Sequence, residues 1–232
     1  MTVTEGIKSA FKMKGDKAEV PDMCLNRSLG KAMTGAGTEC WTFLSEKHVK
    51  TAVANIEENL AKSNLRLVSK CHAPFSTDYH PSHDTTKELD AEGTRYFQEL
   101  IGVLRWAIEL GRIDMLLEVE LLSSHLALPR VGHLQQVYHI FGYLKNSPRR
   151  RLFFDPDHPR ISKDWFHKFD WVNFHKDAEE AVPLNAPEPR GREVGIHCFV
   201  DASHAADKVT RRSQTGILIF LNKAPIVFYS KR

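Results

Sequence analysis

Three consecutive stretches in the middle of the chain carry apolar residues at helical spacing, and each is followed by a residue that stops a helix. The stretches and their stops are 97–108 with Gly111, 115–126 with Pro129, and 134–144 with Pro148. Glycine ends a helix because it tolerates positive φ, and proline ends one because it has no amide donor. Since the connections are short, these helices are predicted to pack against one another as a bundle.

A β-hairpin and a further helix are predicted ahead of this bundle. Residues 24–44 contain two β-capable stretches on either side of the glycine-rich turn signal 35–37. Ser45 is predicted as the N-cap of the helix, with Glu46 in the first turn, where the helix dipole favours negative charge. The helix is expected to bury one face, made of Val49, Val53, Ile56 and Leu60.

The last part of the chain has the composition of β-strands. Strands are predicted at 196–201, 215–220 and 225–229, where β-branched and apolar residues concentrate. The connection 221–224 is short enough for a hairpin, and the loop 202–213 is longer. Together with the helices, these strands predict an α+β fold in which a hairpin and a helical bundle precede a three-stranded antiparallel sheet.

Two segments lack a sustained period. Residues 71–90 are rich in Pro, Ser, Thr, Asp and His and are interpreted as a surface loop. Residues 148–192 combine prolines with many charges and are interpreted as a connector along the protein surface. The connector's aromatic residues are expected to anchor it, and the alternative is that they stack on nucleic-acid bases. These residues are Trp165, Phe166, Phe169, Trp171 and Phe174.

The composition is that of an ordinary globular protein, with 42% hydrophobic and 26% charged residues. No apolar run approaches the roughly 18 residues that a membrane span needs, and residues 1–14 lack the apolar core of a secretion signal. The four cysteines lie far apart and form no C-x-x-C pair, which favours reduced thiols. We therefore expect an intracellular protein, cytoplasmic or nuclear, with no membrane partner.

The basic residues are unevenly distributed, although the net charge is only +3. One cluster follows the third predicted helix, and a second lies in the loop 202–213. The members are Lys145, Arg149, Arg150, Arg151, Arg160 and Lys163 in the first, and Lys208, Arg211 and Arg212 in the second. Such clusters attract phosphate backbones by Coulomb attraction and counterion release, but a solvated basic surface gives the same pattern.

Several runs of the sequence resemble copia-type retrotransposon polyproteins. Three runs resemble the thumb- and connection-like helices after the palm of the reverse transcriptase: 96–106 (YFQELIGVLRW), 122–129 (LSSHLALP) and 132–145 (GHLQQVYHIFGYLK). Run 185–191 resembles the connector of that family. Three further runs resemble the start of its RNase H domain: 198–205 (CFVDASHA), 207–216 (DKVTRRSQTG) and 224–232 (APIVFYSKR).

The resemblance implies three parts. Residues 1–147 would be the end of a reverse transcriptase, with the hairpin and the thumb- and connection-like helices. Residues 148–194 would be the connector, and 195–232 a partial RNase H-like domain with a truncated three-stranded sheet. In this interpretation the polymerase palm lies before Met1.

The resemblance also implies two metal-dependent reactions, neither of which the chain is expected to catalyse alone. Reverse transcription uses palm aspartates in a Tyr-x-Asp-Asp turn, and the sequence has no Asp-Asp pair. RNase H cleavage uses a carboxylate cluster that binds Mg²⁺, and Asp201 matches its first member, as a catalytic residue and metal ligand. No acidic residue follows Asp207, which is interpreted as a loop residue, and Ser203 and Ala206 replace an aspartate and a glycine common in the family. We therefore expect Mg²⁺ for the parent polyprotein and none bound tightly by this chain.

The implied partners are an RNA–DNA hybrid and the remainder of the polyprotein. The residues expected to bind nucleic acid are Lys145, Arg149, Arg150, Arg151, Arg211 and Arg212. Two alternatives stay open. One is a non-catalytic scaffold or binding protein derived from a retroelement, and the other is a nonfunctional remnant whose unfinished sheet exposes an open edge.

Overall fold

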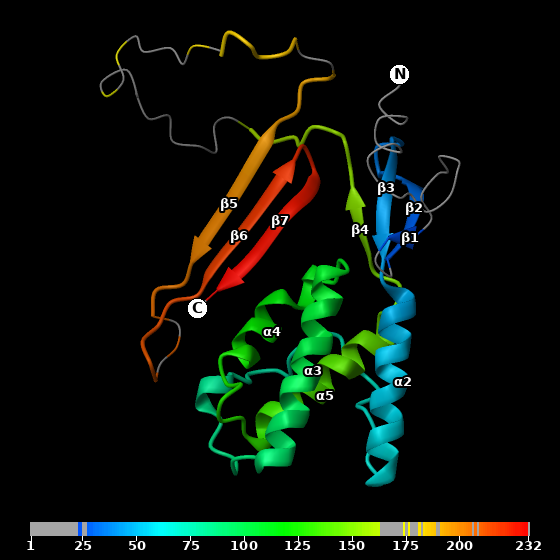
Figure 1. The fold of residues 1–232 in the computed structure, drawn as a ribbon, viewed down its shortest axis with the longest axis vertical. Coiled ribbons are helices and arrows are strands. Elements are labelled where there is room, and N and C mark those ends of the chain that lie inside the picture. The colour runs from blue at the N-terminus through cyan, green and yellow to red at the C-terminus, as the bar shows by residue number, and fades with distance from the viewer. Residues whose placement is uncertain are drawn as a thin grey trace, which may run out of the picture.

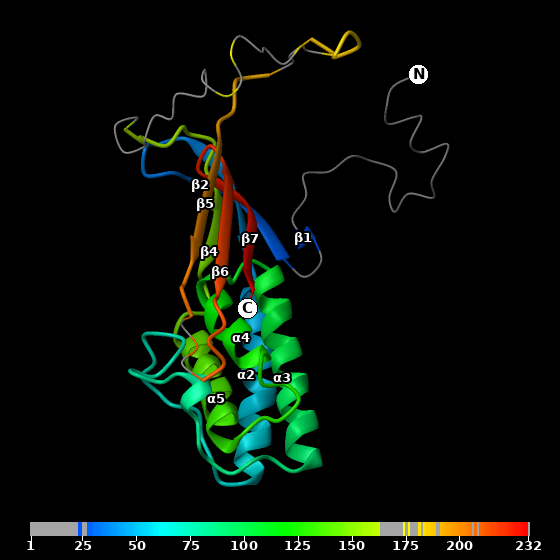
Figure 2. The same ribbon diagram turned by 90° about the vertical axis from the view of Figure 1, so that its left-hand side faces the viewer.

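Two antiparallel sheets and a cluster of helices give this computed structural model an α+β fold (Figure 1). The structure describes residues 23–24, 27–162, 174, 176, 181, 183–188, 191–205, 207 and 209–231. Figure 2 shows, in a second view, that the strands gather at one end of the molecule and the helices at the other. Within these described ranges, no helix combines the length and the apolar character needed to cross a membrane.

The first sheet joins the predicted hairpin to a strand from much later in the chain. Its strands, all antiparallel to their neighbours, are in order β1 (Met23–Cys24), β2 (Arg27–Met33), β3 (Glu39–Leu44) and β4 (Arg151–Phe154). The β2–β3 turn is closed by a 2.8 Å hydrogen bond from the Thr34 amide to the Thr38 carbonyl. Gly37 in this turn has a φ of 85°, which glycine adopts at low cost. The predicted hairpin is confirmed.

The segment from residue 148 onward, interpreted as a connector along the surface, contains a strand that was not predicted, β4. Leu152 is buried, and the ring of Phe154 packs edge-on against Phe43 with 4.6 Å between centroids. A strand this short carries little periodic signal, and its stability comes from pairing with β3 and from this packing. Of the aromatic residues expected to anchor the connector, Phe174 is largely exposed, and the other four lie outside the described residues.

The helices follow the predicted stretches. They are α2 (Glu46–Lys62), α3 (Ala91–Glu109), α4 (Leu116–Ser123) and α5 (Val131–Asn146), with the short 3₁₀ helices η1 (Pro81–His83) and η2 (Ile113–Met115). Their apolar faces form a common core, to which α2 contributes the four predicted residues and Ala52. Gly111 follows α3 with a φ of 107°, the conformation for which glycine is favoured after a helix.

Two helix ends differ in detail from the prediction. α4 ends at Ser123, so Leu126 lies beyond the helix and is only partly buried. The hydroxyls of Ser123 and Ser124 donate to backbone carbonyls of α4, and such local bonds compete with further helix. Ser45 occupies the N-cap position of α2, as predicted, but its side chain makes no capping hydrogen bond. Its ψ is 20°, whereas a capping residue usually has an extended backbone that lets its side-chain oxygen reach the amides of the first turn.

The second sheet contains the three strands predicted near the end of the sequence. They are β5 (Ile196–Ala202), β6 (Thr215–Leu221) and β7 (Ala224–Lys231), antiparallel and in that order. Asn222 begins the tight turn between β6 and β7 with a φ of 54°, a region in which asparagine is enriched. The prediction of these strands and of their hairpin is confirmed.

The second sheet packs onto the helices and shares a loop with the first sheet. Phe228 on β7 packs against the helical core. In the loop after β4, the Pro156 carbonyl accepts a 2.7 Å hydrogen bond from Asn222 Nδ2, and Asp157 Oδ1 accepts one of 2.8 Å from Thr38 Oγ1. The turns of both hairpins are therefore bound to the same loop, which holds the two sheets side by side.

Two helical glycines allow a matched test of this packing. A Cβ added at Gly142 of α5 would lie 2.9 Å from both Cys71 Sγ and the Val68 carbonyl oxygen, whereas one added at Gly102 of α3 meets nothing within 4 Å. We expect Gly142→Ala to lower the free energy of unfolding by about 1–3 kcal/mol through overpacking. Gly102→Ala should raise it by about 0.5–1 kcal/mol, because alanine favours helix. Urea denaturation followed by circular dichroism measures both, and equal effects would contradict the close contact at Gly142.

Candidate functional site

Asp201 lies on β5, one residue before the strand ends. Its backbone pairs with Gly216 of β6, and the residue is exposed. It borders a cavity of about 850 Å³ between the second sheet and α4. Asp201 therefore lies near the end of a strand, as the sequence predicted.

The cavity beside Asp201 is walled mainly by apolar side chains. They include Ile113, Leu116, Leu117 and Leu121 from the helical side, and Phe199, Val200, Leu218 and Tyr229 from the sheet. The polar wall holds Ser203, Gln214 and Ser230, and Gln214 Nε2 donates to Ser230 Oγ at 2.6 Å. No lysine or arginine of the described residues lines this cavity, so a phosphate group gains no fixed counter-charge inside it.

A second acidic residue does not complete a metal site beside Asp201. The described residues contain no group of three or more His, Cys, Asp or Glu side chains placed to hold a metal ion. Asp207 is buried, and its Oδ1 accepts hydrogen bonds from the amides of Val209 at 2.8 Å and Thr210 at 2.9 Å. Asp207 therefore stabilises the β5–β6 loop. A two-metal site needs several convergent carboxylates, so the described residues around Asp201 do not fit the Mg²⁺ pair of the nuclease that the sequence resembles.

Four residues of the first basic cluster, Lys145 and Arg149–Arg151, surround the end of α5 and the start of β4 and are called the first group below; three of these four make ion pairs. Lys145 Nζ lies 2.6 Å from Glu57 Oε1, and Arg149 Nε lies 2.9 Å from Glu46 Oε1. Hydrogen bonds from Lys50 and Arg149 lower the pKa of Glu46, so this carboxylate holds its negative charge beside the arginine.

Arg150 and Arg151, the other two arginines among these four residues, differ in their surroundings. Arg150 lies 3.4 Å from Asp114 Oδ2 and stacks over the Tyr143 ring, 5.1 Å from its centroid. Arg151 is exposed on β4 and forms no ion pair within the described part of the chain. Arg149, which is 77% exposed, and Arg151 are therefore the most accessible cations of the group.

The second basic group lies elsewhere on the molecule. Arg211 and Arg212 are exposed in the loop between β5 and β6, where Arg211 has a φ of 58° and its amide donates to the Asp207 carbonyl. Figure 1 shows this loop and the start of β4 on opposite sides of the structure. The basic residues chosen from the sequence therefore form two separate surfaces. Lys208 of the second group lies outside the described residues.

A buried ionic network behind the first group escaped the sequence analysis. Arg112 is 1% exposed and donates to both carboxylate oxygens of Asp114 at 2.9 Å and to the Ser147 carbonyl at 3.1 Å. The Tyr143 hydroxyl donates to Asp114 Oδ2 at 2.6 Å. Burial alone would raise the pKa of Asp114, but the bonds and charges of Arg112, Tyr143 and Arg150 lower it overall. The network fixes the end of α5, from which Arg149–Arg151 follow.

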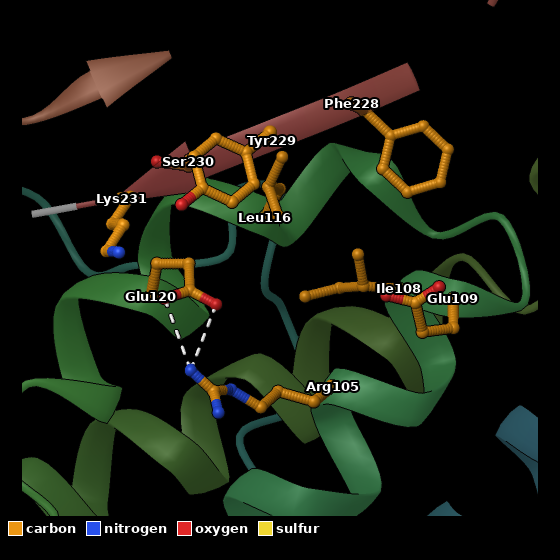
Figure 3. Close-up of a pocket in the computed structure, with 9 residues that line it drawn as sticks. All are labelled: Arg105, Ile108, Glu109, Leu116, Glu120, Phe228, Tyr229, Ser230 and Lys231. Atoms are coloured by element: carbon orange, nitrogen blue, oxygen red, sulfur yellow. Dashed lines mark hydrogen bonds and ion pairs between the residues drawn. The ribbon is translucent and has the colours of Figure 1, made fainter. Parts of the chain in front are cut away.

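A second cavity, of about 410 Å³, separates β7 from α3 and α4 (Figure 3). Figure 3 shows Tyr229, Ser230 and Lys231 on β7, across the gap from the helices. Its two central charged groups are already paired, since Arg105 Nη2 lies 3.1 Å and 3.3 Å from the two carboxylate oxygens of Glu120. Arg105 and Glu120 therefore neutralise each other, and neither offers a free charge to a ligand.

Comparison with known proteins provides no family assignment: no protein-family model, curated protein or solved structure matches this chain.

Proposed function

We propose that this chain is part of a copia-type retrotransposon reverse transcriptase and RNase H polyprotein, and that it helps to position an RNA–DNA hybrid. The proposal includes an intracellular location, cytoplasmic or nuclear. Its first support is the set of sequence runs that resemble copia-type polyproteins. The observation that carries it is the position of Asp201, which lies near the end of the first strand of a three-stranded antiparallel sheet that follows a hairpin and a set of helices in the implied order.

The arginines at the start of β4 are the proposed contact with the hybrid backbone. Arg149 and Arg151 are exposed, and the ion pair of Arg149 with Glu46 lies at the surface. Exposed ion pairs contribute only about 0–1 kcal/mol. A phosphate that releases condensed counterions can therefore displace Glu46 at small cost.

Binding, and not cleavage, is the proposed role of this chain by itself. Asp201 offers one carboxylate, and the described residues do not add the further ligands of a two-metal centre. In the proposed parent protein, the remaining acidic residues, the Mg²⁺ ions and the polymerase palm belong to other segments of the polyprotein.

The proposal predicts a salt-dependent interaction with an RNA–DNA hybrid. Replacing Arg149, Arg150 and Arg151 together by alanine should weaken binding at every hybrid sequence. If each arginine neutralises one phosphate, the slope of log K against log salt should fall by about 2.7, since each contact contributes about 0.9. Fluorescence anisotropy with a labelled hybrid, measured over a salt series, gives this slope directly. An unchanged slope contradicts the proposed contact.

The chain offers a control that removes equal charge at a distance. Lys62 and Arg95 are exposed on the ends of α2 and α3 that point away from β4, and Lys87 is exposed in the loop beside the start of α5, where its carbonyl accepts a hydrogen bond from the Val131 amide. Helices of this length separate the two sites by roughly 25 Å. Their triple alanine variant should keep most of the wild-type slope. Equal losses in both variants would indicate a diffuse charge effect.

The ion pairs around the first basic group favour a second candidate, a non-catalytic scaffold that uses these residues within the fold. Glu57, Glu46 and Asp114 each hold one of the four basic residues in this group. A scaffold of this kind would show no salt-dependent shift with the hybrid in the anisotropy experiment. The same measurement therefore separates the two candidates.

A further inference from the structure

Residues 76–85, here called the η1 loop, lie against the start of α5. Pro81 in this loop is buried, and its carbonyl oxygen lies 3.0 Å from His133 Nε2. The Ser76 amide and hydroxyl both donate to Gln136 Oε1, in the second turn of α5. The η1 loop is therefore held on the first two turns of α5 by polar contacts.

His133, the third residue of α5, is 1% exposed, and both of its ring nitrogens are hydrogen-bonded. A carbonyl oxygen only accepts, so Nε2 carries the hydrogen that it donates to Pro81. A backbone amide only donates, so Nδ1 is the unprotonated nitrogen that accepts from the Arg130 amide at 3.0 Å. The rings of His125 and of Phe97 on α3 lie beside it, with centroids 4.3 Å and 6.4 Å away. These two hydrogen bonds require a neutral imidazole.

The surroundings of His133 also favour its neutral form. Burial, the largest effect, lowers the pKa of His133 below its ordinary value of 6.5. The bond to the Pro81 carbonyl and the carboxylate of Asp84 in the η1 loop act in the opposite direction, and the positive charge of Arg130 lowers the pKa further. Protonation of His125 would add another positive charge beside the ring. The net effect is a lowered pKa for His133.

We propose that protonation of His133 releases the η1 loop from α5, so that His133 acts as a pH-sensitive switch. An imidazolium carries hydrogens on both nitrogens, so its Nδ1–H would point at the Arg130 N–H, donor against donor. A charged ring is also costly to keep buried. Since Phe97 belongs to the helical core and Pro81 to a loop, the η1 loop is the side that gives way. This inference does not rest on the proposed function.

The switch should act below about pH 6.5. Above the ordinary pKa, His133 is neutral whether the loop is closed or released, and its two bonds stabilise the closed loop in full. As the pH falls below this value, the released form takes up a proton that the closed form, with its lowered pKa, resists, so release becomes more favourable. At pH 5.5 a released imidazole is protonated about ten to one, so the loop should open up to about tenfold more often than at pH 7.5.

Hydrogen–deuterium exchange of the full chain, followed by mass spectrometry at pH 7.5 and pH 5.5, tests the release. Each rate is divided by the intrinsic exchange rate at that pH. Protection of peptides covering 76–85 should fall by up to about tenfold at pH 5.5, while peptides from the core of α3, residues 100–108, should keep theirs. Unchanged protection of the η1 loop overturns the proposal. An equal loss in α3 also overturns it, because the chain would then unfold as a whole.

The variant His133→Gln removes the titration and keeps the bond. Glutamine at the third position of a helix accepts from the N-cap amide, as in a capping box. Protection of the η1 loop in this variant should be the same at both pH values. His83→Gln is the matched control, because His83 is exposed in the same loop, and this variant should keep the pH dependence of the wild type. A pH dependence that persists in His133→Gln would assign it to His80, whose Nδ1 accepts from the Ser82 amide at 3.3 Å, and would overturn the role of His133.

A measurement on the wild-type chain covers the case in which the His133→Gln variant misfolds. Slow exchange of the hydrogen on the imidazole carbon between the two nitrogens, followed by mass spectrometry over a pH series, gives the pKa of each histidine. His133 should titrate below 6.5, and the exposed His83 provides the reference in the same sample. A pKa of 6.5 or above at His133 would mean that the closed loop accepts the proton, and it would overturn the proposal.

Discussion

Replacing Arg112 by alanine is expected to lower the free energy of unfolding by about 3 kcal/mol, the low end of the cost of removing one partner of a buried ion pair, because Asp114 is partly exposed and keeps Arg150. Arg112 is 1% exposed and donates to both oxygens of Asp114. Without it, Asp114 keeps the Tyr143 hydroxyl and the partly exposed Arg150, and the Ser147 carbonyl loses a donor. Urea denaturation monitored by circular dichroism measures the loss.

The control for this experiment is an arginine whose ion pair is exposed. Arg105 bonds both oxygens of Glu120 at 3.1 Å and 3.3 Å, but its side chain is half exposed. Arg105→Ala should therefore change the free energy of unfolding by less than about 1 kcal/mol. If the two variants lost similar free energy, burial would not be what makes the Arg112 network costly to break. Arg112→Lys keeps the charge without the planar fork, so its intermediate loss would measure the part due to geometry.

Local signals were sufficient to predict most of the fold. The apolar spacing of Phe97, Ile101, Leu104 and Ile108 identified α3, and each of these residues is buried in the core. Gly111 was identified as the residue that ends α3, because a positive φ after a helix is a property of that one residue and glycine adopts it readily. The strands β5 to β7 were predicted because β-branched and apolar residues concentrate in them and a tight turn links the last two.

The features that the sequence did not predict depend on distant partners. β4 is a strand because β3, more than a hundred residues earlier, provides the pairing edge. Arg112 looks like any surface arginine in the sequence, and only the folded chain shows it enclosed with Asp114 and Ser147. Burial of a charged group is the sum of many non-local contacts, so no local pattern reports it.

The same reasoning explains how far the candidate site could be predicted. The strand position of Asp201 follows from the β-branched and apolar residues concentrated in 196–201, but the apolar cavity beside it depends on how α4 packs against the second sheet. The basic residues near β4 were identified as a charge cluster. Their carboxylate partners Glu46, Glu57 and Asp114 come from other elements, and only the fold brings them together.

Replacing Phe141 by alanine should be at least as damaging as the loss of Arg112, for a different physical reason. Phe141 is fully buried on α5, which packs against both α2 and α3. Removing a buried phenylalanine ring costs about 3–5 kcal/mol, because transfer free energy is lost and a cavity remains that its neighbours fill only partly. In a chain of this size each kcal/mol lowers the melting temperature by about 2–4 °C. Phe153 on β4, which is 44% exposed, is the matched control, and Phe153→Ala should cost far less. If the Phe141→Ala and Phe153→Ala variants had the same melting temperature, α5 would not form the centre of the core.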